Sequence, residues 1–116
     1  MQLTALVLDN DLGFCMWLAQ ILSQAGIRAL PTCRAEEALE MCAHTATNID
    51  LIIVNPEVEG SRRLLRENRG AKVIAIGAPR TLTVDATLHR PVGRTFPATE
   101  RYLDSIRAVL GETRPN

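Results

Sequence analysis

The sequence is poor in aromatic residues and carries no net charge. Phenylalanine, tryptophan and tyrosine make up 3% of its 116 residues, and 13 basic side chains balance 13 acidic ones. A chain without net charge has no overall field to attract nucleic acid or a membrane surface. We therefore expect neither of these as a partner.

Paired cysteine motifs and long apolar runs are also absent. Cys15, Cys33 and Cys42 are odd in number and have no CxxC spacing, so neither a disulfide framework nor a zinc site is predicted. No apolar run approaches the roughly 18 residues of a membrane span. The amino terminus lacks the basic start of a secretory signal. We expect a soluble cytoplasmic protein without a cofactor.

The length and the hydrophobic content suit one compact domain. Hydrophobic residues make up 47% of the 116 positions, which is enough for a sizeable core. We expect a single domain over residues 1–116, with its core at about residues 3–110 and a frayed tail at residues 111–116.

Apolar runs and helical periodicities alternate along the chain. Strands are predicted at residues 3–8, 27–31, 51–54, 73–76 and 86–89, and helices at residues 12–25, 34–43, 61–68 and 99–110. This alternation predicts βαβ units, and hence a five-stranded parallel sheet with helices on both faces. Pro31 favours an edge position for the second strand, since a missing donor is tolerated there.

The connection between the fourth and fifth strands is unusually short. A parallel crossover takes at least about 10–12 residues, helix included. Residues 77–85 fall below that length. We expect a turn or a loop where a fourth helix would normally lie.

Asn55 occupies the position with the greatest chemical consequence. It follows the apolar run 51–54, at the carboxyl end of a predicted parallel strand, where ligands gather in open α/β sheets. A carboxylate there could attack a phosphoryl donor and hold charge beside a metal ion. A carboxamide does neither at useful strength.

The order and spacing of these segments resemble the bacterial response-regulator receiver domain, the CheY-like fold. The supporting stretches are Leu6 to Asp11, Ala25-Gly26, Cys33 to Glu40, Asp50 to Asn55 and Arg90-Pro91. The resemblance covers nearly the whole chain. It implies a doubly wound α/β domain of the (βα)5 flavodoxin/CheY-like class, here with its fourth helix shortened or absent.

The resemblance also implies a phosphorylation site. In that family, two adjacent acidic residues after the first strand hold magnesium, and an aspartate after the third strand is phosphorylated. A serine or threonine after the fourth strand contacts the phosphoryl group. A Lys-Pro pair follows the fifth strand, and an aromatic residue three positions before that lysine rotates on activation.

This sequence departs from the family pattern at most of those positions. Asp9 is kept, but Asn10 replaces its acidic neighbour and Asp11 stands one residue further on. The phosphoacceptor, the hydroxyl residue, the aromatic residue and the lysine are replaced by Asn55, Gly77, Thr87 and Arg90. We predict a degenerate pocket without a catalytic residue or a metal site, in which Arg90 can pair with Asp9, and no enzymatic activity.

Other polar residues have simpler interpretations. Asp9 and Asp11 could cap the first helix instead of binding metal. A basic cluster could touch phosphate groups, but no aromatic residue interleaves for base stacking, so a solvated helix face is favoured. This basic cluster consists of Arg62, Arg63, Arg66, Arg69 and Lys72. His44 and His89 have no nearby nucleophile or ligand pattern.

The first helix carries a second apolar stripe beside its core stripe. This second stripe consists of Leu12, Cys15, Met16 and Ala19, with Trp17 between the two stripes. A helix that is apolar nearly all round is either deeply buried or docked on a partner. The resemblance implies docking on the helical bundle of a histidine kinase or a phosphotransfer protein. The alternative is local packing with Met16 folded inward.

The sequence therefore favours a non-catalytic, phosphorylation-independent receiver domain that binds another protein in bacterial two-component or related signalling. The partner would be a histidine kinase, a phosphotransfer protein or another regulator, and a homodimer is a further option. Two alternatives remain open. One is a receiver still phosphorylated at Asp9 or Asp11, and the other is a small-ligand sensor that uses the vacated acidic pocket.

Overall fold

A five-stranded parallel sheet forms the centre of the molecule. The computed structural model describes residues 2–44, 48–90 and 96–111. The strands are β1 (Thr4–Leu8), β2 (Arg28–Thr32), β3 (Leu51–Val54), β4 (Lys72–Ile76) and β5 (Ala86–Leu88), in the order β2-β1-β3-β4-β5. This is the doubly wound flavodoxin/CheY-like order. The predicted fold class is confirmed, as is the edge position of the second strand, which contains Pro31.

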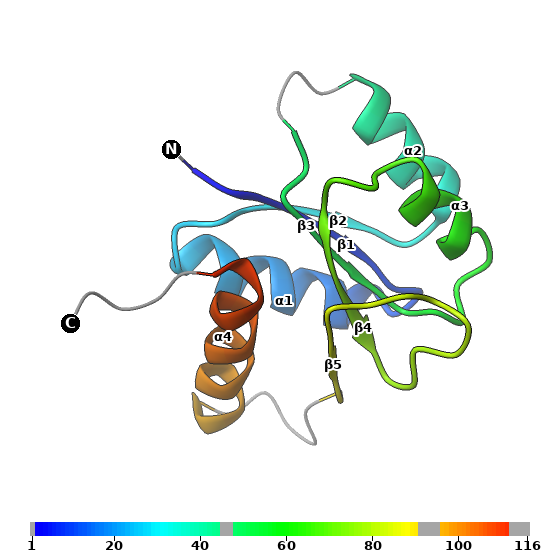
Figure 1. The fold of residues 1–116 in the computed structure, drawn as a ribbon. Coiled ribbons are helices and arrows are strands. Elements are labelled where there is room, and N and C mark those ends of the chain that lie inside the picture. Colours follow the sequence, from blue (N-terminus) through cyan, green and yellow to red (C-terminus); the bar gives the residue numbers. More distant parts are fainter. Residues whose placement is uncertain (1, 45–47, 91–95, 112–116) are drawn as a thin grey trace.

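Helices cover the two faces of the sheet unequally (Figure 1). The long helices α1 (Leu12–Gln24) and α4 (Phe96–Leu110) lie on one face, and the shorter α2 (Ala35–His44) and α3 (Ser61–Arg66) lie on the other. We call these the α1/α4 face and the α2/α3 face. Among the described residues, no helix has the length and apolar character needed to cross a membrane.

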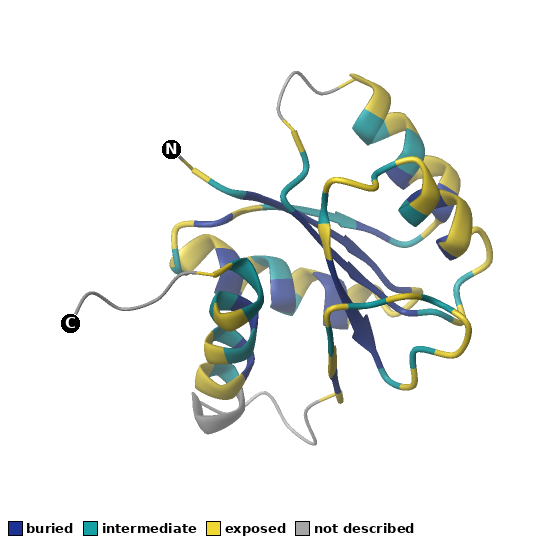
Figure 2. Cartoon of the chain, in the orientation of Figure 1, coloured by how far each residue is buried: buried dark blue, intermediate teal, exposed yellow. Residues whose placement is uncertain are grey.

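Successive strand residues point to opposite faces, and both faces are apolar. In β1, Ala5 and Val7 join the cluster under α1 and α4, whereas Leu6 and Leu8 join the cluster under α2 and α3. Residues 51–54 of β3 divide in the same way. This period of two explains why these strands read as continuous apolar runs in the sequence. Figure 2 shows the central strands as the most deeply buried part of the chain.

Two aspartates hold the amino-terminal edge of the sheet. Oδ2 of Asp50 accepts a hydrogen bond from the backbone N–H of Thr4 at 2.8 Å. Oδ2 of Asp85 accepts one from the backbone N–H of Val73 at 2.7 Å. Each aspartate precedes a strand and bonds the strand beside it, so these contacts help to fix the register.

The predicted element bounds need small corrections. Helix α4 begins at Phe96 rather than residue 99, and α3 ends at Arg66 rather than residue 68. Gly60 precedes α3 with φ +91°, and a Cβ atom there would come within 2.6 Å of the Cβ of Ala35. Glycine therefore permits α3 to approach α2. Of the predicted frayed tail, residues 112–116 lie outside the described residues.

The connection between β4 and β5 contains no helix, as its length predicted. Residues 77–85 form a loop with one turn, in which the N–H of Leu82 donates to the carbonyl oxygen of Pro79 at 3.0 Å. Leu82 and Val84 pack partly against the cluster on the α2/α3 face. Two side chains thus partly cover the area that a crossover helix would occupy.

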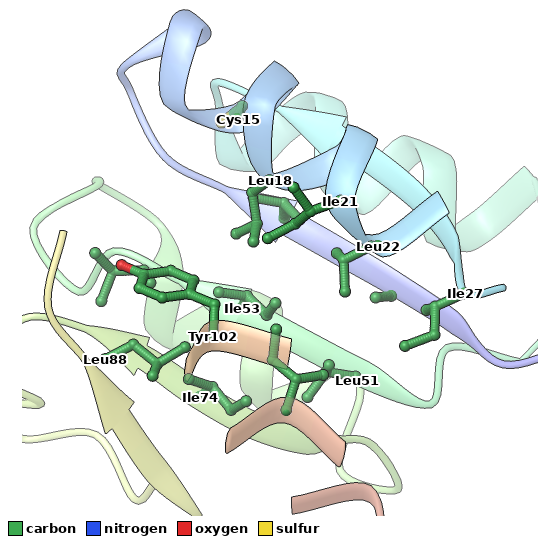
Figure 3. Packing of buried hydrophobic residues seen from close by; sticks show 14 of the residues in the cluster. Cys15, Leu18, Ile21, Leu22, Ile27, Leu51, Ile53, Ile74, Leu88 and Tyr102 are labelled. Atoms are coloured by element: carbon green, nitrogen blue, oxygen red, sulfur yellow. The ribbon is translucent and has the colours of Figure 1, made fainter. Parts of the chain in front are cut away.

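Three aromatic side chains join the two helices of the α1/α4 face. The ring of Trp17 lies 5.9 Å from that of Phe14 and 5.5 Å from that of Tyr102, between ring centroids. Phe14 and Tyr102 meet edge to face at 6.4 Å. Figure 3 shows Tyr102 beside Leu88 and Ile53 in this core. Such pairs add to the stabilisation from simple burial.

Candidate functional site

Asp9 is the centre of the polar site at the carboxyl edge of the sheet. It follows β1 and is completely buried. Its Oδ1 accepts a hydrogen bond from the backbone N–H of Asp11 at 2.8 Å. One guanidinium nitrogen of Arg90 lies 2.6 Å from Oδ1 and 2.5 Å from Oδ2. Both oxygens of the carboxylate are therefore engaged, and the predicted pairing of Arg90 with Asp9 is confirmed.

Arg90 is held from several sides. Its guanidinium carbon lies 4.7 Å from the centre of the Phe14 ring, a cation–π contact. Its Nη1 lies 3.6 Å from Oδ2 of Asp11. The hydrogen bond to the Asp9 carboxylate is the main cause that raises the pKa of Arg90 above its ordinary value. The planar guanidinium can meet a carboxylate and an aromatic ring at once, which an ammonium group does less well.

Tyr102 supports the segment that carries Arg90. Its hydroxyl donates a hydrogen bond to the backbone carbonyl oxygen of His89. Burial raises the pKa of Tyr102 to about 12. A neutral phenol donating to the residue before Arg90 fixes the backbone from which the guanidinium extends.

Asp11 caps the first helix, as the simpler interpretation expected. Its Oδ1 accepts a hydrogen bond from the backbone N–H of Phe14 at 3.1 Å, and its side chain is 54% exposed. The capping interpretation is wrong for Asp9, whose carboxylate binds the N–H of Asp11 and the guanidinium instead. The two aspartates thus have different roles although one residue separates them.

The side chain of Asn55 is occupied by its own loop. Asn55 is 8% exposed, and its Oδ1 accepts a hydrogen bond from the backbone N–H of Glu57 at 2.9 Å. This is an Asx turn, a common use of asparagine at the end of a strand. The backbone N–H of Asn55 donates to the carbonyl oxygen of Leu8, which places it next to the end of β1.

The remaining predicted pocket residues do not join the ion pair. Asn10 and Thr87 are exposed, and Gly77 directly follows β4 with φ +85°. Within residues 2–44, 48–90 and 96–111, no hydrogen bond or ion pair connects these three residues with Asp9 or Arg90. The structure therefore brings together only Asp9, Asp11 and Arg90 of the predicted set, with Asn55 beside them.

The site does not fit the magnesium ion that the family resemblance implies. Magnesium requires near-octahedral oxygen ligands and is held mainly by carboxylate charge. Both oxygens of Asp9 face Arg90, and the neighbouring ligand position is the exposed amide Asn10. The described part of the chain contains no group of three or more His, Cys, Asp or Glu side chains able to hold a metal ion.

The predicted apolar stripe of α1 is partly exposed and needs one correction. Leu12 and Met16 are 61% and 53% exposed, whereas Cys15 is completely buried. Cys15 precedes Leu18 and Leu22 by three and seven residues, which places it on the core side of the helix. Its thiol donates to the backbone oxygen of Asp9 at 3.2 Å, and burial is the main cause that raises its pKa to about 12.

A shallow hollow adjoins the exposed part of α1. Met16, Trp17 and Ala19 line it from the helix, and Ala29 and Pro31 line it from edge strand β2. Its volume is about 870 Å³. Three of the five residues predicted as an interaction surface thus border one depression. We call Leu12, Met16 and this depression the α1 surface.

Sequence reasoning missed the aromatic support of the ion pair. Neither Phe14 nor Tyr102 was predicted to take part in the site. No local signal links Tyr102 to the site, because its contact with His89 depends on how α4 packs.

The two histidines make backbone contacts. Nδ1 of His44 lies 2.8 Å from the backbone oxygen of Glu40. The exposed His89 accepts the hydrogen bond from Tyr102 through its carbonyl group.

Comparison of the sequence with protein-family models and with curated proteins gave no match. Solved structures do match. A response regulator receiver protein from Burkholderia phymatum is 22% identical with a TM-score of 0.77, over 99% of this chain and 100% of that one. The receiver domain of the hybrid histidine kinase CckA is 23% identical with a TM-score of 0.72, over 92% and 98% of the two chains.

A third similar structure contains two proteins. It is the P1 domain of CheA3 in complex with CheY6 from R. sphaeroides, with 19% identity, a TM-score of 0.77 and coverage of 94% and 97%. At these low identities, the TM-scores show that this chain shares the fold of receiver domains.

Proposed function

We propose that this chain is a phosphorylation-independent, non-catalytic receiver domain that binds a protein partner in two-component or related regulatory signalling in the cytoplasm. The fold shared with receiver domains supports the signalling context. The single observation that carries the loss of chemistry is the ion pair between Arg90 and Asp9.

By the family resemblance, the ion pair lies where a receiver domain would hold a metal ion beside the phosphoryl group. Arg90 neutralises the one buried carboxylate of the site, so a divalent cation would have to displace a guanidinium held at 2.5 Å. Removing Arg90 would leave the buried carboxylate of Asp9 without its counter-charge, which is costly. These contacts support a site that stays closed to a divalent cation. In addition, Asn55 carries a carboxamide in place of the carboxylate that would attack a phosphoryl donor.

The α1 surface is the best candidate for partner binding. Leu12 and Met16 are the exposed large hydrophobic side chains of the described residues. Exposed apolar groups that lie together on a soluble protein often mark an interface. The neighbour CheY6 was solved bound to the P1 domain of a CheA protein, which supports a kinase or phosphotransfer domain as the partner. A second copy of the chain is the alternative partner.

Phosphorylation at another aspartate is the main alternative function. Asp9 offers no free oxygen and no exposure. Asp11 is more accessible, with a side chain 54% exposed, although it caps α1. A small-ligand sensor would need to use the pocket that Arg90 now fills. Phosphorylation at Asp9 and ligand binding at this position both require the ion pair to open, whereas phosphorylation at Asp11 competes with its capping bond to Phe14.

The phosphorylation experiment tests the proposal directly. After incubation with acetyl phosphate and magnesium, we expect the intact mass to be unchanged. We also expect beryllofluoride to leave the amide spectrum unshifted. A stoichiometric phosphoryl adduct would contradict the proposal, and peptide mapping would then assign it to Asp9, Asp11 or another residue.

The single substitution Asn55→Asp should not restore efficient chemistry. It supplies the nucleophile, but Arg90 still occupies the carboxylate of Asp9. The variant would also still lack the serine or threonine that the family has at position 77. A side chain there would be strained, because φ of Gly77 is +85°. Rapid phosphorylation of Asn55→Asp would show that the ion pair opens readily, and the proposed closed site would then be wrong.

A charge substitution tests the α1 surface. Met16→Glu places a carboxylate at the centre of the exposed apolar area and should abolish partner binding or self-association while the fold is kept. Gln24→Glu adds the same charge at an exposed position of α1 outside the hollow and serves as the control. Pull-down with kinase and phosphotransfer domains, together with sedimentation of the chain alone, measures both. Equal binding by parent and Met16→Glu would place the interface elsewhere.

A further inference from the structure

A second hollow lies on the α2/α3 face, away from the ion pair of Asp9 and Arg90. Helix α3, the start of β4 and the loop of residues 81–85 enclose it, and its volume is about 560 Å³. That volume lies within the roughly 300–1,000 Å³ of small-molecule sites. Figure 1 shows the loop between β4 and β5 passing beside α3. We call this hollow the α3 groove.

The α3 groove is strongly basic in a chain without net charge. Its lining includes Arg62, Arg66, Arg69 and Lys72, against one acidic residue, Asp85. The carboxylate of Asp85 already accepts the backbone N–H of Val73 at 2.7 Å. Four positive charges around one hollow repel each other unless an anion or solvent ions neutralise them.

None of the four basic side chains makes an ion pair within the described parts of the chain. Arg62 donates a hydrogen bond to the hydroxyl of Thr81, across the groove. By contrast, Arg63 on the same helix binds Glu67 at 2.7 Å and does not line the groove. The helix thus presents a neutralised arginine on one side and unneutralised arginines on the other.

The groove also has an apolar wall. Leu65 and Leu82 face it from the helix and the loop and are half-buried, and Val73 adds to the wall from β4. Here a loop takes the place of a crossover helix, and its side chains Leu82 and Val84 pack only partly against this face. A fitting ligand therefore combines several negative charges with a flat or apolar part.

We propose that the α3 groove binds a nucleoside di- or triphosphate. The phosphates would contact Arg66, Arg69 and Lys72, since guanidinium groups bind phosphate oxygens in pairs. The base would lie against the apolar wall formed by Leu65 and Leu82. The sequence favoured a solvated helix face for this basic cluster, and its five residues are exposed. The proposal adds a ligand for the four that line the groove. The site acts independently of the proposed protein-interaction function.

Titration of the labelled full chain with ATP, ADP, AMP and pyrophosphate tests the site by amide NMR. We expect shifts confined to residues 61–73 and 81–85, with ATP and ADP binding at least about tenfold more tightly than AMP. Pyrophosphate should bind more weakly than ADP, because it lacks the base. Shifts spread over the whole surface, or equal affinity for AMP and ATP, would overturn the proposal.

Matched arginine variants separate a built site from general attraction. Arg66→Gln should weaken ATP binding at least about tenfold, since it loses a charge-assisted hydrogen bond to phosphate. Arg63→Gln removes a charge from the same helix outside the groove and should leave the affinity unchanged. Equal weakening by both changes would overturn the site, as would tight binding of an RNA oligonucleotide that ATP does not displace.

Discussion

Both faces of the sheet are apolar, but helices cover them differently. On one face, α1 and α4 provide 13 and 15 helical residues and meet through three aromatic rings. On the other, α2 and α3 provide 10 and 6 residues, and a loop replaces the crossover helix. The same strands form both faces, so the sheet persists although the α2/α3 face has less helical cover. The α3 groove lies on that less covered face.

The comparison also separates two polar regions. At the carboxyl edge, the charges of Asp9 and Arg90 are paired, and contacts with Phe14 and Tyr102 support the segment that carries Arg90. On the α2/α3 face, a loop connects β4 with β5, and the basic side chains that line the α3 groove make no ion pair within the described residues. Protein groups satisfy the charges of the first region, whereas those of the second are open to solvent or a ligand.

The largest expected effect compares two buried leucines on the two faces. Leu18 and Leu64 are both completely buried. Leu18→Ala leaves a cavity between long, well-anchored helices and should lower the free energy of unfolding by about 3–5 kcal/mol. Leu64→Ala should cost about 2–3 kcal/mol, because the short α3 can relax into its cavity. Urea unfolding measures both, and an equal or larger loss for Leu64→Ala would show that the α2/α3 face is as rigidly packed.

Two ion pairs of equal length test whether burial decides how much an ion pair contributes to the free energy of unfolding. Arg90–Asp9 and Arg80–Glu57 both show 2.5 Å separations, but the Asp9 side chain is 1% exposed and that of Glu57 64%. Arg90→Gln should cost about 2–3 kcal/mol, because it leaves a buried carboxylate with one hydrogen bond. Arg80→Gln should cost less than about 1 kcal/mol. Similar losses in thermal and urea unfolding would mean that Arg90 contributes little beyond a surface contact.

Alkaline pH should weaken the α1/α4 face in particular. Burial raises the pKa of Cys15 from 9 and that of Tyr102 from 10, each to about 12. In this pH range the thiol and the phenol lose their protons in the unfolded chain but keep them in the folded protein. The free energy of unfolding therefore falls as pH rises from 9 towards 12. Tyr102→Phe should flatten the fall above pH 10 in urea unfolding at stepped pH. An unchanged profile would show that the phenol is solvated in the folded protein.

The smallest effect is local and concerns the loop between β4 and β5. Amide hydrogens of residues 78–84 should exchange quickly, apart from Leu82, whose N–H bonds Pro79. Those of residues 73–76 in β4 should exchange slowly, because they lie within the sheet. Hydrogen exchange read by NMR checks this. Uniform protection through residues 78–84 would indicate an ordered helix and remove the opening of the α3 groove.

The sequence predicted the fold well because its signals there were local. The apolar run 51–54 begins and ends where β3 does, since polar residues flank it. The short connection after Gly77 excluded a helix by length alone. The pairing of Arg90 with Asp9, 81 residues apart, was also predicted, because the family resemblance placed both in one pocket.

The sequence could not predict features that depend on packing between distant elements. The sequence predicted Cys15 on the second apolar stripe of α1, but the position of that helix on the sheet buries its thiol. The hydrogen bond from Tyr102 to His89 depends on the placement of α4. The basic residues of α3 looked like a solvated face because nothing in their spacing reveals the loop opposite them.

The two edge strands determine how copies of this protein can meet. At one edge, β2 carries an exposed Arg28 and a proline at position 31, which offers no N–H to a neighbouring strand. At the other, β5 is only three residues long. Charge, proline and shortness all discourage a sheet from continuing into another molecule. Ribbon-like aggregation is thereby disfavoured even at high concentration, and any assembly must be built from side-chain surfaces instead of shared backbone ladders.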